Sequence, residues 1–275
     1  MKLSIITINY NNSTGLQKTM ESVFGQTSNE FEYIIIDGNS SDASKAVIIQ
    51  YTNNSNLNFN WISETDDGIY HAMNKGIQMA KGDYVQFLNS GDCLVVSNVT
   101  ENMLSSIPND CDIFYGNMLK QIQGKIIRDR GFEGKIPTMF DFYTGTLNHS
   151  PTYIKRELFK IYGFYDEKLK IVSDWKWYLQ VITLNRVIPK YIDIDVTLFD
   201  MTGISNVNSY LDKCERKQVL SEILPIAVLE DYERWSIPID QVKRINRYCL
   251  IRKSFRLVER LLFKWEKWFL VKKYR

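Results

Sequence analysis

The sequence has few features of secreted, membrane-spanning or metal-stapled proteins. Its four cysteines lie far apart and form no C-x-x-C pair, which argues against a zinc site and a disulfide framework. It has no run of about 18 apolar residues, so we expect no segment that spans a bilayer. The first residues, MKLSIITINYNN, lack the long apolar core and cleavage site of a signal peptide. These absences predict a cytoplasmic protein.

The composition is ordinary for a globular protein, but the charge is segregated. Of the 275 residues, 44% are hydrophobic and 24% are charged, which argues against disorder or a fibrous fold. Residues 243–275 carry a net charge of +10 from twelve Lys/Arg and two Glu, whereas the preceding 242 residues carry −8. A mildly acidic body with a strongly basic tail indicates an anionic surface as a partner.

The first half of the chain alternates between strand and helix patterns. Apolar runs rich in β-branched residues are typical of strands buried on both faces. They predict strands at 3–8, 31–37, 59–64 and 83–88. Apolar residues at helical spacing predict helices at 16–24, 43–51 and 68–80, with Ser13 or Thr14 capping the first. This alternation predicts an α/β fold with a mainly parallel central sheet.

The pattern loosens in the second half. We expect a helix at 97–107, a hairpin at 112–118 and 125–130, and a loop-rich stretch at 131–148. Two helical segments around a glycine turn are expected in 156–182, and helical character returns across 208–232. No repeat or low-complexity linker marks a domain boundary before about residue 240.

Polar clusters follow each of the four predicted strands. They read NYNN (9–12), DGNSSD (37–42), ETDDG (64–68) and NSGD (89–92). Ligands of open parallel sheets bind outside the carboxyl ends of the strands. Four such clusters in register therefore predict one ligand site, although ordinary loop and capping residues are the alternative.

These stretches resemble the family 2 glycosyltransferases, which have the GT-A fold and use a nucleotide-sugar donor. The matching segments are SIITINYNN, ESVFGQT, FEYIIIDGNSSD, SETDDGIYHAMNKGIQMAKGDYVQFLNSGD and NHSPTYIKRELFKIYGFYDEKLKIVSDWKWYLQ, within residues 1–205. The SETDDGIYHAMNKG segment resembles bacterial exopolysaccharide and colanic-acid-type transferases. The resemblance implies a GT-A-like domain over 1–240, with a nucleotide-sugar-binding half at 1–95, an acceptor-side half at 96–240 and a basic helix at 241–275.

The first two strand ends are expected to hold the nucleotide. Tyr10, with Thr7 and Asn9, would supply a stacking surface for the base. The resemblance implies that Asp37 accepts from the imide N–H of uracil, unless it is a capping or turn residue. Asp42 is expected to be a helix N-cap.

The third strand end is expected to contact the rest of the donor. Asp67 and Gly68 lie where the third strand gives way to a predicted helix N-terminus, a suitable place for nucleotide or sugar hydroxyls. Lys75 on that helix would contact a phosphate, or would be solvated. His71 is expected to be structural or exposed.

The fourth strand end departs from the family pattern. Family members typically carry Asp-x-Asp or Asp-x-Asp-Asp here, whose carboxylates bridge Mg²⁺ or Mn²⁺ to the diphosphate, whereas these positions read Asn89, Ser90, Gly91 and Asp92. Because Mg²⁺ keeps several waters and uses one or two carboxylates, Asp92 with phosphate oxygens would be enough. Asn89 and Ser90 would contact the metal or donor, and Gly91 would let the backbone approach the phosphates.

The resemblance also implies an inverting reaction with a carboxylate base. The matching residue is Asp174, where an apolar run meets a predicted helix that Ser173 could cap; Asp174 as a helix-end residue is the alternative. Trp175 could form a sugar-stacking wall with Trp177, or belong to the core. His149 would contact the acceptor or a phosphate, or be structural. Residues 203–205 (GIS) resemble a loop that closes on the donor.

The C-terminal segment has the pattern of a basic amphipathic helix. Apolar residues recur at spacings of three and four from Tyr248 to Phe269, and basic residues occupy the other face. This composition is typical of a helix that lies in a membrane interface. Docking on the domain or pairing with a second copy is the alternative, and nothing resembles a nucleic-acid-binding module.

We therefore expect an inverting glycosyltransferase at the inner face of the plasma membrane. Its donor would be a nucleotide sugar, expected to be a UDP-sugar, with Mg²⁺ or Mn²⁺, and its acceptor a lipid-linked glycan of a bacterial surface polysaccharide. One alternative is a sugar nucleotidyltransferase, which would need a Gly-rich basic phosphate loop that NYNNSTGL does not provide. The other is a non-catalytic nucleotide-sugar-binding or scaffold protein.

Overall fold

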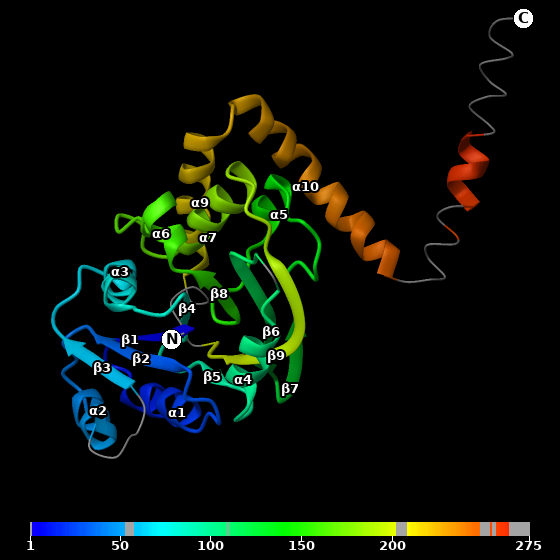
Figure 1. Ribbon diagram of the computed structural model, residues 1–275. Coiled ribbons are helices and arrows are strands. Elements are labelled where there is room, and N and C mark those ends of the chain that lie inside the picture. Colours follow the sequence, from blue (N-terminus) through cyan, green and yellow to red (C-terminus); the bar gives the residue numbers. More distant parts are fainter. Residues whose placement is uncertain are drawn as a thin grey trace, which may run out of the picture. The chain divides into compact units, whose positions relative to one another are not determined.

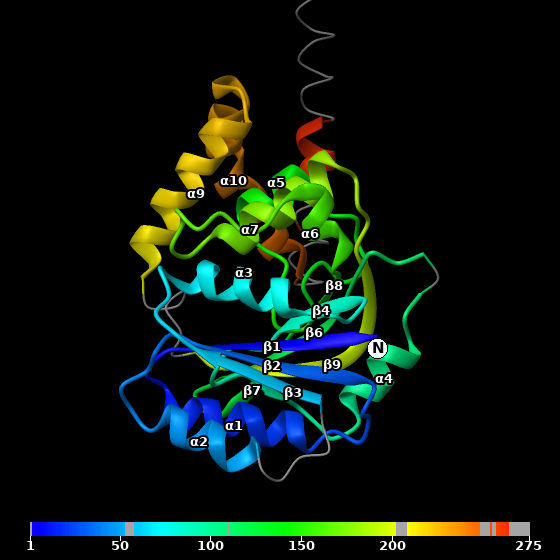
Figure 2. The ribbon, with the colours of Figure 1, turned by 60° about the vertical axis from the view of Figure 1, so that its left-hand side comes forward.

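A computed structural model of the protein is shown in Figures 1 and 2. It describes residues 2–52, 58–108, 110–201, 208–247, 254 and 257–263. The chain divides into two compact units, Met1–Val219 and Leu220–Arg275. The sequence-based division at residue 240 stays a prediction.

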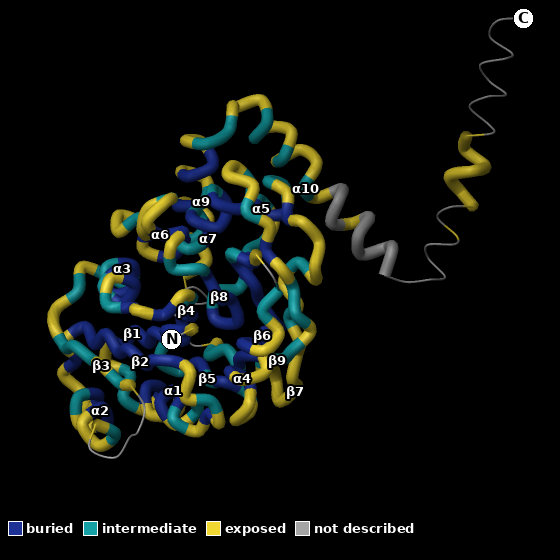
Figure 3. The backbone as a smooth tube through the Cα atoms, in the orientation of Figure 1, coloured by how far each residue is buried: buried dark blue, intermediate teal, exposed yellow. Residues whose placement is uncertain are grey.

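Four parallel strands form the N-terminal half of the sheet. In spatial order they are β3 (Asn58–Ser63), β2 (Phe31–Asp37), β1 (Leu3–Asn9) and β4 (Tyr84–Phe87). Every residue of β1 and β2 is buried, as expected for strands covered on both faces (Figure 3). The chain runs outward from β1 through β2 to β3 and then returns to the other side of β1 with β4. The strand order therefore reverses between β1 and β4, where ligands of such sheets bind.

Helices cover both faces of this half-sheet. Helices α1 (Ser13–Phe24) and α2 (Ser44–Thr52) lie on one face, and α3 (Ile69–Met79) lies on the other (Figure 2). The prediction of Ser13 or Thr14 as the cap of α1 is wrong, because the Asn12 side chain accepts from the Gly15 N–H at 3.0 Å. Asn and Ser have nearly equal preference for this position, so the pattern did not separate them.

Antiparallel pairing extends the sheet into the second half. Strand β8 (Thr152–Lys155) lies between β4 and β6 (Ile113–Ile122) and is antiparallel to both. Strand β9 (Lys190–Phe199) follows, parallel to β6, and pairs with the short β5 (Cys93–Leu94). Strand β7 (Lys125–Asp129) completes the predicted hairpin with β6. The α/β fold class and the parallel core of the sheet are confirmed.

The remaining helices are mostly short. They are α4 (Val99–Ser105), α5 (Met139–Thr144), α6 (Glu157–Tyr162), α7 (Ser173–Tyr178), the π-helical η1 (Leu179–Leu184), α9 (Ser209–Ile223) and α10 (Ile226–Arg247). Helix α5 falls in the stretch expected to be loop-rich, and its capping box between Thr138 and Asp141 was not recognised. Among the described residues, no helix combines the length and the apolar character needed to cross a bilayer.

Candidate active site

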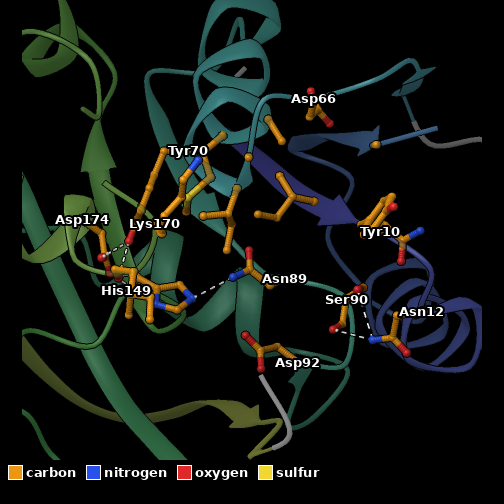
Figure 4. Close-up of a pocket in the computed structure, with 18 of the residues that line it drawn as sticks. Tyr10, Asn12, Asp66, Tyr70, Asn89, Ser90, Asp92, His149, Lys170 and Asp174 are labelled. Carbon is orange, nitrogen blue, oxygen red and sulfur yellow. Dashed lines mark hydrogen bonds and ion pairs between the residues drawn. The ribbon is translucent and has the colours of Figure 1, made fainter. Parts of the chain in front are cut away.

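A cavity of about 890 Å³ opens at the carboxyl ends of the parallel strands (Figure 4). All four polar clusters contribute to it. The residues from these clusters are Asn9, Tyr10, Asn12, Gly38, Asn39, Thr65, Asp66, Gly68, Asn89, Ser90 and Asp92. The second half of the first unit adds His149, Lys170, Ile171, Asp174, Phe199 and Asp200. This volume is within the range of small-molecule sites.

The cavity has two chemically different sides. Tyr10 lies on one side, after β1, and its side chain is 70% exposed, so a planar base can stack on the ring. His149 and Asp174 lie on the opposite side (Figure 4). Thr7 does not line the cavity, because it is buried within β1 and its hydroxyl donates to the Leu88 carbonyl at 2.7 Å.

Asp37 lies behind the cavity wall. Its carboxylate accepts from the N–H and hydroxyl of Ser40, the Ser63 hydroxyl and the Asn9 amide, and it has no exposed surface. Burial alone would raise the pKa of Asp37, but these hydrogen bonds together lower it below its ordinary value. The carboxylate joins the ends of β1, β2 and β3.

At the third strand end, the acidic residue that lines the cavity is not the predicted one. Asp66 and Gly68 line it, whereas Asp67 does not, and the Asp67 N–H donates to Nδ1 of His71 at 3.0 Å. Lys75 also lies outside the lining, with Nζ 2.7 Å from carboxylate oxygens of both Glu64 and Asp66. Burial opposes a charge on Lys75, but these two carboxylates raise its pKa.

The NSGD turn presents Asn89, Ser90 and Asp92 to the cavity, whereas Gly91 supports the turn from outside the lining. Gly91 has a φ of 109°, and a Cβ there would collide with the Asp200 carboxylate. The turn therefore needs glycine for its backbone conformation and for the approach of Asp200.

Asp92 is a buried carboxylate at the edge of the cavity, beside Asp200. It is 2% exposed, and its Oδ1 accepts from the Asp200 N–H at 2.8 Å. Its Oδ2 is buried and has no hydrogen-bond partner within the described part of the chain. Burial raises the pKa of Asp92 to about 7; the Asp200 carboxylate adds to the rise, and the N–H of Asp200 opposes it.

This arrangement fits a divalent cation that takes only a few of its ligands from the protein. The described residues contain no cluster of three or more His, Cys, Asp and Glu side chains able to hold a metal. An unpartnered carboxylate oxygen of Asp92, with the Asp200 carboxylate beside it, suits a hard cation whose other ligands are phosphate oxygens and water.

On the other side of the cavity, Asp174 is the second residue of α7. Its Oδ1 accepts from the Tyr70 hydroxyl at 2.8 Å, and its Oδ2 lies 3.7 Å from Nδ1 of His149. Nε2 of His149 contacts Nδ2 of Asn89 at 3.3 Å. Burial lowers the pKa of His149, although Asp174 opposes this, and therefore favours the neutral ring. The prediction that Ser173 caps the helix is wrong, because Val172 is the N-cap and the Ser173 hydroxyl has no partner among the described residues.

A buried glutamate on α9 fixes the loop before Asp174. Glu215 is 7% exposed, and its carboxylate accepts the backbone N–H groups of residues 170, 171 and 172. Three such hydrogen bonds hold the start of α7 in place.

Trp175 and Trp177, which follow Asp174 in the sequence, belong to the core rather than to the cavity wall. Trp175 is 1% exposed, does not line the cavity, and donates from Nε1 to the carbonyls of Phe142 and Gly145. The guanidinium of Arg216 lies 4.5 Å from the centre of its ring. Trp177 is 3% exposed and donates to the Gly163 carbonyl.

Several cavity residues were not recognised in the sequence: Asp66, Tyr70, Lys170, Ile171, Phe199 and Asp200. Lys170 is an exposed lysine for whose Nζ the structure records no hydrogen bond or ion pair with any described residue. Tyr70 and Asp66 lie inside the SETDDGIYHAMNKG segment, so that segment held the signal for both. The predicted GIS loop at 203–205 lies outside the described residues.

Comparison with known proteins identifies the family. The sequence profile of the family described as Glycosyl transferase family 2 matches residues 4–158, more than half of the chain. The chain belongs to glycosyltransferase family 2. A PGL/p-HBAD biosynthesis glycosyltransferase of Mycobacterium bovis is 24% identical over 208 residues, covering 74% of this chain and 78% of the relative.

Solved structures of glycosyltransferases share the fold. S. aureus TarS 1–349 in complex with UDP-GlcNAc superposes with a TM-score of 0.63 at 19% identity, covering 84% of this chain and 70% of TarS. The mannosyltransferase PcManGT from Pyrobaculum calidifontis, in complex with GDP-Man and Mn²⁺, superposes with a TM-score of 0.59 at 13% identity, covering 72% of this chain and 56% of PcManGT. The family 2 chain is a glycosyltransferase with a GT-A-like fold, and neither the nucleotidyltransferase nor the scaffold alternative is favoured.

Proposed function

We propose that this family 2 enzyme transfers a sugar with inversion from a UDP-sugar to a hydroxyl of a lipid-linked glycan. The observation that carries the proposal is the placement of Asp174 across one cavity from Tyr10. A base stacked on Tyr10 would extend its diphosphate along the NSGD turn. The sugar would then lie between that turn and Asp174.

The reaction is an in-line displacement with Asp174 as the base. The carboxylate removes the proton of the acceptor hydroxyl as the hydroxyl oxygen forms its bond to the anomeric carbon. The bond between the anomeric carbon and the diphosphate oxygen breaks, and the nucleoside diphosphate leaves with that electron pair. Because the attacking and leaving oxygens lie on opposite faces of the sugar, the configuration inverts.

We propose that Asp92 and Asp200 hold one Mg²⁺ or Mn²⁺ together with the donor phosphates. A bound cation supplies charge stabilisation for the departing diphosphate. Asn89, Ser90 and Gly68 line the cavity. Asn89 and Ser90 would contact the ribose or phosphates, and Gly68, at the start of α3, would lie beside the sugar. For Asp37, Asp67, Thr7 and Lys75, which lie outside the lining, we propose support of these loops rather than contact with the donor.

The nucleotide is tested by competition between donors. UDP and GDP derivatives share their phosphate chemistry but differ in the base that Tyr10 and Asn9 would meet. We expect UDP to raise the melting temperature and UDP-sugars to be turned over, with GDP-mannose inactive. Turnover of GDP-mannose without turnover of any UDP-sugar would contradict the UDP assignment and leave the glycosyltransferase assignment intact.

We further propose that the C-terminal segment binds an anionic membrane and so brings the enzyme to a lipid-linked acceptor. Part of the segment, residues 257–263, is helical, and five of its apolar side chains are more than half exposed: Leu257, Val258, Leu261, Leu262 and Phe263. Of these five, Val258 and Leu262 belong to the predicted stripe, whose other members, Tyr248, Ile251, Phe255, Trp265 and Phe269, lie outside the described residues. Apolar groups flanked by basic ones suit the boundary between head groups and acyl chains.

Liposome co-sedimentation tests this part. We expect deletion of 244–275 to release the protein from vesicles containing phosphatidylglycerol, and Val258→Ser with Leu262→Ser to weaken binding. Transfer to a short soluble acceptor should persist in both variants. Binding that survives the deletion would contradict the membrane role without touching the active-site proposal.

A further inference from the structure

Tyr70 places one hydroxyl between two acceptors at the edge of the active site. Its oxygen lies 2.8 Å from Oδ1 of Asp174 and 2.5 Å from the carbonyl oxygen of Ile171. Tyr70 is on the first turn of α3, and it is 4% exposed. Burial, followed by the nearby Asp174 carboxylate, raises the pKa of Tyr70 well above its ordinary value, so the phenol stays protonated.

A phenol has one hydrogen, so Tyr70 can donate to only one of these acceptors at a time. When Asp174 is ionised, donation to its carboxylate is charge-assisted and is the stronger of the two. When Asp174 is neutral, that advantage is lost, and the hydrogen can turn to the Ile171 carbonyl. The hydroxyl then has a partner in both protonation states of Asp174, with no movement of a heavy atom.

We propose that Tyr70 is a positioning residue that assigns different roles to the two oxygens of Asp174. Oδ1 is held by the Tyr70 hydroxyl, and no hydrogen bond to a described residue engages Oδ2. Oδ2 is therefore the oxygen that receives the acceptor proton. In that step the O–H bond of the acceptor breaks and an O–H bond to Oδ2 forms, while Tyr70 keeps its own proton. This inference rests on the proposed role of Asp174 as the base.

The other titratable groups around Asp174 do not duplicate this contact. His149 faces Oδ2 at 3.7 Å, and Lys170 lies four residues before Asp174 along the same cavity wall. The buried hydroxyls of Tyr165 and Tyr178 also feel the Asp174 charge, but within the described part of the chain no hydrogen bond joins either of them to its carboxylate. Tyr70 alone of the three tyrosines donates to the carboxylate in this part of the chain.

Two consequences follow for catalysis. The Tyr70 hydroxyl stabilises the negative charge of the carboxylate through a charge-assisted hydrogen bond. The hydroxyl also fixes the carboxylate plane, so that Oδ2 meets the acceptor in a reactive orientation. Both effects act on the transfer step and not on nucleotide binding.

The test is Tyr70→Phe in the full-length enzyme, with Tyr165→Phe as the matched control. Tyr165 is buried beside Tyr70, with ring centres 5.7 Å apart, and loses an unpartnered hydroxyl in the same substitution. For Tyr70→Phe we expect kcat to fall about 10- to 100-fold, as for loss of a hydrogen bond to a charged group. The dissociation constant of UDP should stay unchanged, so that the loss falls on the transfer step. Tyr165→Phe should leave kcat unchanged.

The outcomes separate this inference from the proposed function. If Asp174→Asn abolishes transfer but Tyr70→Phe keeps the kcat of Tyr165→Phe, Tyr70 does not act on the base and the inference fails alone. If Asp174→Asn retains transfer, the base assignment itself fails. A lower melting temperature of Tyr70→Phe with an unchanged kcat would show a structural role only, and would also overturn the inference.

Discussion

The amide nitrogen of Asn89 contacts Nε2 of His149 at 3.3 Å, although the two residues are 60 positions apart in the chain. An amide nitrogen can only donate, so Nε2 of a neutral His149 accepts and the ring hydrogen lies on Nδ1. Nδ1 faces Asp174 at 3.7 Å. The contact thus connects the end of β4, where the diphosphate is proposed to bind, with the proposed base.

The hydrogen-bond partners of the two imidazole rings predict the tautomer of each histidine in the protein. His149 should carry its hydrogen on Nδ1, whereas His71 should carry it on Nε2, because Nδ1 of His71 accepts from the Asp67 N–H at 3.0 Å. Nitrogen-15 NMR of the imidazole rings distinguishes the two forms, and with only two histidines in the chain a His71→Gln variant assigns the signals. A hydrogen on Nε2 of His149 would contradict the link to Asn89.

The two lysines near the cavity should differ in their effect on the donor. Lys75 is already paired with Glu64 and Asp66, whereas Nζ of Lys170 has no recorded partner among the described residues and lines the cavity. We expect Lys170→Met to raise the donor KM about tenfold, the loss of one charged contact to phosphate. Lys75→Met is the matched control and should change KM much less. The reverse order would show that Lys75 contacts the diphosphate.

Asp37 should contribute to stability in a pH-dependent manner. Its pKa is lowered in the folded protein, so its contribution is present above about pH 4 and is lost as pH falls through the folded pKa. We expect Asp37→Asn to reduce the free energy of unfolding by about 1–3 kcal/mol at neutral pH. In urea unfolding at several pH values, this difference should shrink below about pH 4. A difference that is constant from pH 3 to 7 would contradict the hydrogen-bonded role.

Removal of the metal should stop transfer. We expect a chelator to abolish activity, excess Mn²⁺ to restore it, and Asp92→Ala to resist that rescue. Electron paramagnetic resonance of Mn²⁺ with UDP should show binding to the wild type and to Asp67→Asn, a control outside the cavity lining, but not to Asp92→Ala. Full activity in chelator would mean that transfer is metal-independent.

The N-terminal half of the sheet could be predicted from its sequence because each element there carries a local signal. Strands β1 and β2 are apolar runs, and polar clusters mark the four strand ends that form one side of the cavity. The second half of the fold could not be predicted to the same extent. Asp200 reaches the cavity only because β9 pairs with β5 and ends beside Asp92, 108 positions earlier in the chain.

Local patterns also did not distinguish a side chain that faces the cavity from its neighbour that faces the core. Asp66 lines the cavity although Asp67 was the predicted residue, and Trp175 packs inward one position after Asp174. Such choices depend on the path of the backbone at the end of β3 and at the start of α7. In the second case the path is set by Glu215 on α9, from a distant part of the chain.

The most direct test of the account is the activity of Asp174→Asn. The substitution keeps the shape of the side chain and removes the base. We predict that transfer to acceptor falls by about 10²–10⁴-fold, the usual contribution of a positioned base, while calorimetry gives an unchanged affinity for UDP. Turnover near the wild-type rate would contradict the assignment of Asp174 as the base.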